Sequence, residues 1–108
     1  EREGRRFPDV SWHGNLLNRP PWDDPESRLL VCTLGAMESW EADLHVIMNM
    51  GAKAVQLPLP EHPGLQWHRA IDTAREAPGN IVRQEQQVPH RTPACRVAPH
   101  SVVVFEGR

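Results

Sequence analysis

Residues 43–59 read DLHVIMNMGAKAVQLPL, and the spacing of apolar side chains in this stretch decides the fold class. From Asp43 to Met50 the chain alternates as a strand does, with every second side chain on one face. That face would carry Leu44, Val46, Met48 and Met50. A helix over Met37–Met48 is the alternative, because its apolar residues could share one helical face. The alternation favours the strand.

A turn at Gly51-Ala52 follows this strand, and a second alternating run extends from Lys53 to Leu59. Two alternating runs joined by so short a connection predict a β-hairpin. Pro58 and Pro60 lack a backbone N–H, so the second strand should end there or lie at a sheet edge.

Short β-type runs separated by turn residues recur along the rest of the chain. They are Val10–Leu16, Arg28–Leu34, Gln66–Thr73, Thr92–Ala98 and His100–Glu106. Arg28–Leu34 is apolar on both faces, which predicts a central strand covered on two sides. Residues 77–91 are polar and contain Pro78-Gly79-Asn80, so we expect a long mobile loop. The fold class is therefore all-β, an antiparallel β-sandwich of about seven to eight short strands.

The core is predicted from the strand faces, with the more apolar face of each strand assigned inward. On this basis we expect burial of Leu30, Cys32, Leu34, Val46, Met48, Leu57, Trp67, Ile71, Val97, Val102 and Val104. The two cysteines, Cys32 and Cys95, fall in strand-like runs and are expected to be buried thiols rather than a disulfide.

Length and charge limit what the chain can do. Its 108 residues suit one domain, whereas a (β/α)8 barrel typically needs about 250. The net charge of −2 is spread along the chain without a basic face, so no nucleic-acid partner is expected. The apolar runs are too short to cross a membrane. No signal peptide opens the chain, and Glu1 stands where an initiator Met would, so we expect a piece of a longer cytoplasmic protein.

Catalytic, cofactor and metal sites find no support in the residue spacing. Asp23 and Asp24 are adjacent in a proline-framed loop, where Asp is a preferred turn residue. The six histidines show neither an HxH nor an HExxH spacing. We therefore expect no catalytic residue, no cofactor and no metal ligand in this chain.

Tryptophan is the most distinctive residue type. Trp12 and Trp67 lie in strand runs and are expected to pack, whereas Trp22 and Trp40 lie in loops. A tryptophan ring combines a large apolar area with one hydrogen-bond donor, so it suits both packing and contact with a sugar ring. Trp12, Trp22 and Trp40 are the candidate contacts to a glycan or to a neighbouring domain.

An ordered series of short motifs connects these features. The series is Asp9–Gly14, Pro21–Asp23, Ser27–Leu34, Leu44–Asn49, Leu57–Pro60, Trp67, Asp72–Thr73 and Arg96–Phe105. In this order it resembles the C-terminal region of bacterial glycogen-debranching enzymes of the isoamylase type, within the α-amylase superfamily. The chain departs from that pattern at His100, where the family has Arg before Ser-Val-Val-Val.

The resemblance implies that residues 1–108 are a C-terminal β-sandwich fused behind a catalytic (β/α)8 barrel. The parent enzyme would be a glycoside hydrolase that cleaves α-1,6 branch linkages in glycogen, with its catalytic carboxylates on the barrel. The isolated chain would then be no enzyme. Its partner would be the barrel of the same polypeptide, with glycogen or dextrin as a further ligand. An apolar patch of Trp12, Leu16, Leu17 and Trp22 is expected to face the barrel.

Two other functions share the same fold class. The first is an autonomous carbohydrate-binding module in which exposed tryptophans, Trp22 and Trp40, bind sugar. The second is an immunoglobulin-like protein-interaction module. A coplanar exposed pair of tryptophan rings would favour the first of these, and buried rings the accessory domain.

Overall fold

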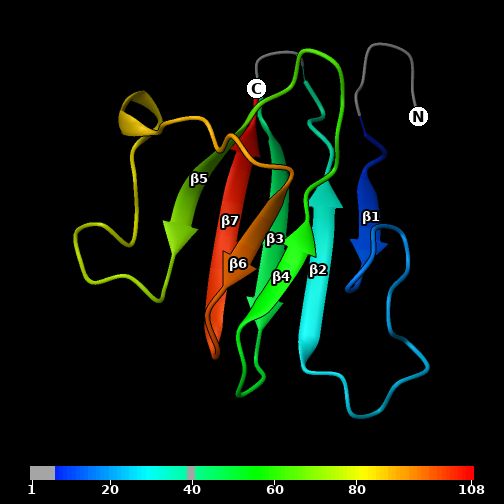
Figure 1. The fold of residues 1–108 in the computed structure, drawn as a ribbon. Helices are drawn as coiled ribbons and strands as arrows, with labels where there is room; N and C mark the ends of the chain where they lie inside the picture. The colour runs from blue at the N-terminus through cyan, green and yellow to red at the C-terminus, as the bar shows by residue number, and fades with distance from the viewer. Residues whose placement is uncertain (1–6, 39–40) are drawn as a thin grey trace.

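The computed structural model describes residues 7–38 and 41–108, which form two antiparallel sheets (Figure 1). The five-stranded sheet has the order β1-β2-β3-β7-β5, and the two-stranded sheet pairs β4 with β6. The strands are β1 (Val10–His13), β2 (Leu29–Leu34), β3 (Asp43–Asn49), β4 (Val55–Pro58), β5 (Trp67–Asp72), β6 (Ala94–Val97) and β7 (Ser101–Gly107). Figure 1 shows β4 and β6 crossing one face of the larger sheet. The predicted all-β sandwich is confirmed.

β1 is shorter than the predicted strand because the chain turns at Gly14. The N–H of Gly14 donates to the Leu16 carbonyl at 3.0 Å, which closes a tight turn. A Cβ on Gly14 would lie 2.5 Å from the Arg19 carbonyl oxygen, so only glycine fits here. The strand therefore ends at His13.

The predicted hairpin between β3 and β4 is wrong. β3 pairs with β2 and β7, whereas β4 pairs with β6 in the other sheet. Asn49 explains the separation: its Nδ2 donates to the Lys53, Val97 and Ala98 carbonyls, at 3.0, 3.3 and 3.1 Å. These bonds draw the connection across to the second sheet. The expected effect of proline is confirmed, since β4 ends at Pro58 in a two-stranded sheet.

The core lies between the two sheets, and its members come from both. It consists of Val31, Ile47, Leu57, Leu59, Trp67, Cys95, Val97, Val103 and Phe105. Of the predicted core, Leu57, Trp67 and Val97 are buried. The predictions for Leu30, Leu34 and Met48 are wrong, because these residues are exposed, whereas Cys32, Val46, Ile71, Val102 and Val104 are half-buried. β2, β3 and β7 thus turn the opposite face inward from the one expected, and β2 is covered on one side only.

The inward faces of β2, β3 and β7 carry polar residues. Because the more apolar face of each strand is predicted to point inward, the prediction selects the wrong face of these three strands. The buried polar set on these strands is Thr33, Asp43, His45, Asn49 and Ser101. Each has at least one hydrogen-bond partner: for example, Asp43 Oδ1 accepts from the Ala36 N–H at 2.7 Å. In this set, His45 Nε2 is the one side-chain atom that is buried without a partner. Burying a polar side chain costs little once it is hydrogen-bonded.

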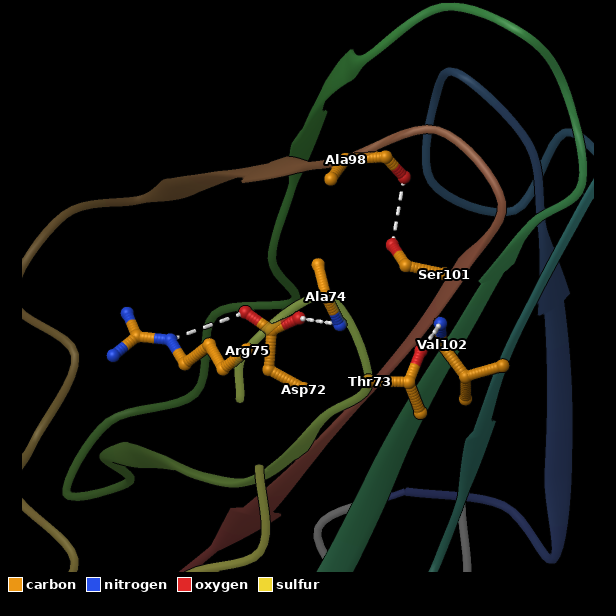
Figure 2. Close-up of polar contacts among 7 residues, drawn as sticks. All are labelled: Asp72, Thr73, Ala74, Arg75, Ala98, Ser101 and Val102. Carbon is orange, nitrogen blue, oxygen red and sulfur yellow. Dashed lines mark hydrogen bonds and ion pairs between the residues drawn. The ribbon is translucent and has the colours of Figure 1, made fainter. Parts of the chain in front are cut away.

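Two of the quoted motifs meet where β5 ends and β7 begins (Figure 2). Thr73 Oγ1 accepts from the Val102 N–H at 2.9 Å, and Ser101 Oγ donates to the Ala98 carbonyl at 2.6 Å. Asp72 Oδ1 accepts from the Ala74 N–H at 3.1 Å. The Asp-Thr and Ser-Val-Val-Val motifs therefore act as structural connections.

Residues 77–91 run beside β5 and contain one turn of 3-10 helix, η1 (Gln84–Gln86). The N–H of Val82 donates to the Ala70 carbonyl at 2.8 Å, and the N–H of His90 donates to the Trp67 carbonyl at 2.7 Å. These bonds cover part of the β5 edge, which would otherwise present unpaired backbone groups. Mobility of this segment stays a prediction.

Candidate functional site

The face of the five-stranded sheet that points away from β4 and β6, here called the outer face, forms the candidate site. Strand register aligns its side chains in rows across the sheet. One row is Val10, Leu34, Leu44, Glu106 and His68; the next is Trp12, Cys32, Val46, Val104 and Ile71; the third is Leu30, Met48 and Val102. Glu106 is the one carboxylate in these rows, and they contain no Lys or Arg.

Five apolar side chains of the outer face are exposed. Val10, Trp12, Leu30, Leu34 and Met48 keep between 36% and 43% of their surface in contact with solvent. Their row neighbours on β2, β3 and β7 are half-buried, so the apolar surface is continuous over β1, β2, β3 and β7, whereas His68 on β5 is buried. Contiguous apolar patches of this kind mark interaction sites on soluble domains.

Trp22 extends the outer face at the β1 end. It is 62% exposed, and its ring contacts that of Trp12 edge-on, with centroids 5.5 Å apart and planes at 67°. The expected packing of Trp12 inside the domain is therefore only partial, since this ring is 39% exposed. Leu16 is also exposed and Leu17 half-buried. The two rings are not coplanar, and Trp40 lies outside the described residues.

A buried chain of hydrogen bonds on the opposite, inward face links two histidines. His13 Nδ1 accepts from the Asn18 N–H at 2.8 Å, so its Nε2–H donates to Thr33 Oγ1 at 2.8 Å. Thr33 Oγ1 also forms a hydrogen bond with His45 Nδ1 at 2.8 Å. Burial, with a smaller contribution from His13, lowers the pKa of His45 to about 3, and burial also lowers the pKa of His13. Both rings are neutral at pH 7, and this series of hydrogen bonds forms part of the packed interior of the domain.

The cysteines are free thiols. Cys95 is buried as expected, and burial raises its pKa to about 11. Cys32 is half-buried and lies on the outer face, not in the core between the sheets. Within residues 7–38 and 41–108, no three His, Cys, Asp or Glu side chains are grouped to hold a metal ion. The same residues include no helix long and apolar enough to cross a membrane.

The architecture defines an antiparallel β-sandwich that leaves one broad apolar sheet face uncovered. A family model described as the C-terminal domain of isoamylases 1–3 matches residues 11–104, and the chain belongs to this family. The chain is 30% identical to isoamylase 2, chloroplastic, of Oryza sativa subsp. japonica, over 99% of its length and 15% of the relative. It is 30% identical to isoamylase 3, chloroplastic, of the same plant, over 93% of the chain and 12% of the relative.

A third relative, isoamylase SU1, chloroplastic, of Zea mays, is 30% identical over 64% of the chain and 8% of its own length. The chain thus spans less than a sixth of each of these relatives. The resemblance to the C-terminal domain of an isoamylase-type debranching enzyme is confirmed.

The sequence predicts one end of the apolar surface and not the rest. Trp12, Leu16 and Trp22 were expected there from the first strand and loop, and all three are exposed. Leu30, Leu34 and Met48 were assigned to the core instead. The polar partners Thr33 and His45, aligned in register on neighbouring strands, carried the signal that the other face points inward.

Proposed function

We propose that this chain is a non-catalytic accessory domain that packs its outer face against the catalytic (β/α)8 barrel of the same polypeptide. The polypeptide would be a glycoside hydrolase that cleaves α-1,6 branch linkages in glycogen. The observation that carries the proposal is the continuous apolar outer face. Domain interfaces within one chain typically bury about 600–1,500 Å², and four adjacent strands with mainly apolar outer side chains suit such a contact.

A charge placed in the outer face tests the packing. Leu34→Asp should leave the isolated chain stable, because Leu34 is exposed there, but should lower the melting temperature of the debranching enzyme that contains the chain. Gln56→Asp, at an exposed position of β4, is the matched control and should have little effect in either protein. Equal melting temperatures of the two variant enzymes would overturn the proposed interface.

We also propose that the isolated chain does not hydrolyse branched glucans. Neither a carboxylate pair at glycosidase spacing nor a barrel was found in the sequence, and the family's catalytic groups belong to the barrel. The purified chain should release no reducing sugar from glycogen. Release that disappears when one of the chain's own carboxylates is mutated would contradict this.

The exposed ring of Trp22 favours a second candidate function, an autonomous carbohydrate-binding module that uses Trp12, Trp22 and Trp40. The 67° between the Trp12 and Trp22 rings weighs against a flat platform for successive sugar rings. Micromolar glycogen affinity that is lost in Trp22→Ala or Trp40→Ala would place this function above the accessory role. An immunoglobulin-like interaction module, a cytoplasmic location and a bacterial origin stay predictions; the relatives above are plant proteins.

A further inference from the structure

A groove of about 830 Å³ lies at one end of the sandwich, between the β4–β5 connection and residues 90–93 before β6. In Figure 1 the β4–β5 connection arches over this end of the molecule. A smaller hollow of about 300 Å³ shares Pro60, Glu61 and His62 with the groove and reaches His13 of β1. The two hollows together offer an elongated site, and the outer-face rows contribute no side chain to the lining of either.

Both walls of the groove are held by Trp67. The Trp67 indole Nε1–H donates to the Pro60 carbonyl at 2.7 Å, which fixes the first wall. The Trp67 carbonyl accepts from the His90 N–H at 2.7 Å, which fixes the second. The Leu59 N–H donates to the Pro93 carbonyl at 2.8 Å and joins the walls at the base. A groove fixed in this way requires little ordering when a ligand binds.

Gly107 permits this arrangement. A Cβ at this position would lie 2.8 Å from the Trp67 ring and 2.9 Å from Leu65. A side chain here on β7 would therefore displace the Trp67 indole, which forms the floor of the groove. The glycine leaves room for the Trp67 indole beside β7. The floor is therefore determined by backbone packing and is independent of any ligand.

The lining combines polar side chains with flat apolar rings. Glu61, Gln66, Arg91 and Thr92 line the groove, and all four are exposed. Pro60, Pro63 and Pro93 provide ring surfaces beside them. One carboxylate and one guanidinium balance each other, which suits a neutral ligand with many hydroxyl groups better than an anion. Pockets with a few polar groups on an apolar lining and volumes of about 300–1,000 Å³ are typical ligand sites.

We propose that this groove binds a linear stretch of α-1,4-linked glucan, as a secondary site away from the catalytic centre. The choice of glucan rests on the proposed function of the parent enzyme. The outer-face rows contribute no side chain to the groove, so a barrel packed on the outer face need not cover it. The site differs from the tryptophan-based module above, because its floor is a buried indole and its contacts are polar.

The tryptophan indole N–H signals in an NMR spectrum of the 108-residue chain test this assignment. Maltoheptaose should shift the indole N–H signal of Trp67, because this N–H donates its hydrogen bond to the Pro60 carbonyl in the groove wall. The indole N–H signals of Trp12 and Trp22 should not shift. We expect a dissociation constant on the order of 1 mM, because the floor offers no exposed aromatic face for stacking. Dispersed signals before the addition of ligand verify that the chain is folded.

The double variant Gln66→Ala/Arg91→Ala should weaken binding about tenfold, through the loss of hydrogen bonds to sugar hydroxyls. Gln56→Ala/Arg96→Ala is the matched control: it removes the same residue types from a cross-strand pair on β4 and β6, and should bind as the wild type does. No shift at Trp67, or shifts at Trp12 and Trp22 alone, would overturn the site. The measurement involves no barrel, so its failure is distinct from failure of the outer-face interface.

Discussion

The His13–Thr33–His45 chain makes the stability of the domain depend on pH. Both imidazoles have pKa values lowered by burial, that of His45 to about 3, whereas an unfolded chain protonates histidine near pH 6.5. For His45, the stability it contributes is complete above about pH 6.5 and is lost as the pH falls toward 3, with a slope of up to about 1.4 kcal/mol per pH unit in that window. The lowered pKa of His13 acts with the same sign, so its contribution is also lost as the pH falls below about 6.5.

Urea unfolding at several pH values between 7.5 and 4 measures this slope. His45→Gln should make the slope shallower, because one buried imidazole no longer resists protonation. His100→Asn is the control: His100 is exposed with a φ of 52°, a conformation that Asn tolerates, and its replacement should leave the slope unchanged. A wild-type stability that does not change over this range would contradict the neutral, buried pair.

Asn49 joins the two sheets through a single side chain. Its Nδ2 donates to three carbonyls, and its Oδ1 accepts from the Gly51 N–H at 3.1 Å. Asn49→Ala should reduce the free energy of unfolding by about 1–3 kcal/mol, because buried carbonyls lose their donor. Asn49→Asp should cost at least as much, since a carboxylate keeps the shape but cannot donate. Urea unfolding tests this, with the exposed Asn15→Ala as control, expected within about 0.5 kcal/mol of the wild type.

At the scale of the strand, the loss of stability on truncating a side chain depends on whether that side chain faces the core or the solvent. Ile47 on β3 is fully buried, whereas Leu34 on β2 is 38% exposed. In the isolated chain, Ile47→Ala should cost about 2–5 kcal/mol, and Leu34→Ala less than about 1 kcal/mol. Equal costs for the two variants in urea unfolding would show that β2 does not face as described.

The positions of the strands were predictable from the sequence, because alternation and turn residues are local signals. The pairing of β3 with β2 and β7, and of β4 with β6, was not, since it depends on residues far apart in the chain such as Asn49 and Val97. The inward faces of β2, β3 and β7 were missed for a related reason. Thr33 and His45 are polar in sequence, and their partners become visible only when the sheets are assembled.

At the scale of the whole molecule, the sequence indicated the family through the order of its motifs. The structure explains several of them: Gly14 ends β1, Asn49 connects the sheets, and Thr73 holds the start of β7. These residues shape the fold through their contacts. The apolar outer face was only partly predictable, because a strand with two apolar faces does not reveal which of them meets the core and which meets another domain.

Without a barrel to cover it, the outer face should drive self-association of the isolated chain. Five exposed apolar side chains on adjacent strands form a flat patch with one carboxylate at its edge, and two copies can bury it against each other. Sedimentation velocity should show a fraction of dimer that rises with protein concentration. The Leu34→Asp variant should remain a monomer, because dimerisation would bury its charge. Gln56→Asp, on the opposite side of the sandwich, should dimerise as the wild type does. A wild-type chain that stays monomeric at millimolar concentration would mean that the outer face is stable in water, and would remove the main support for the proposed contact with a barrel.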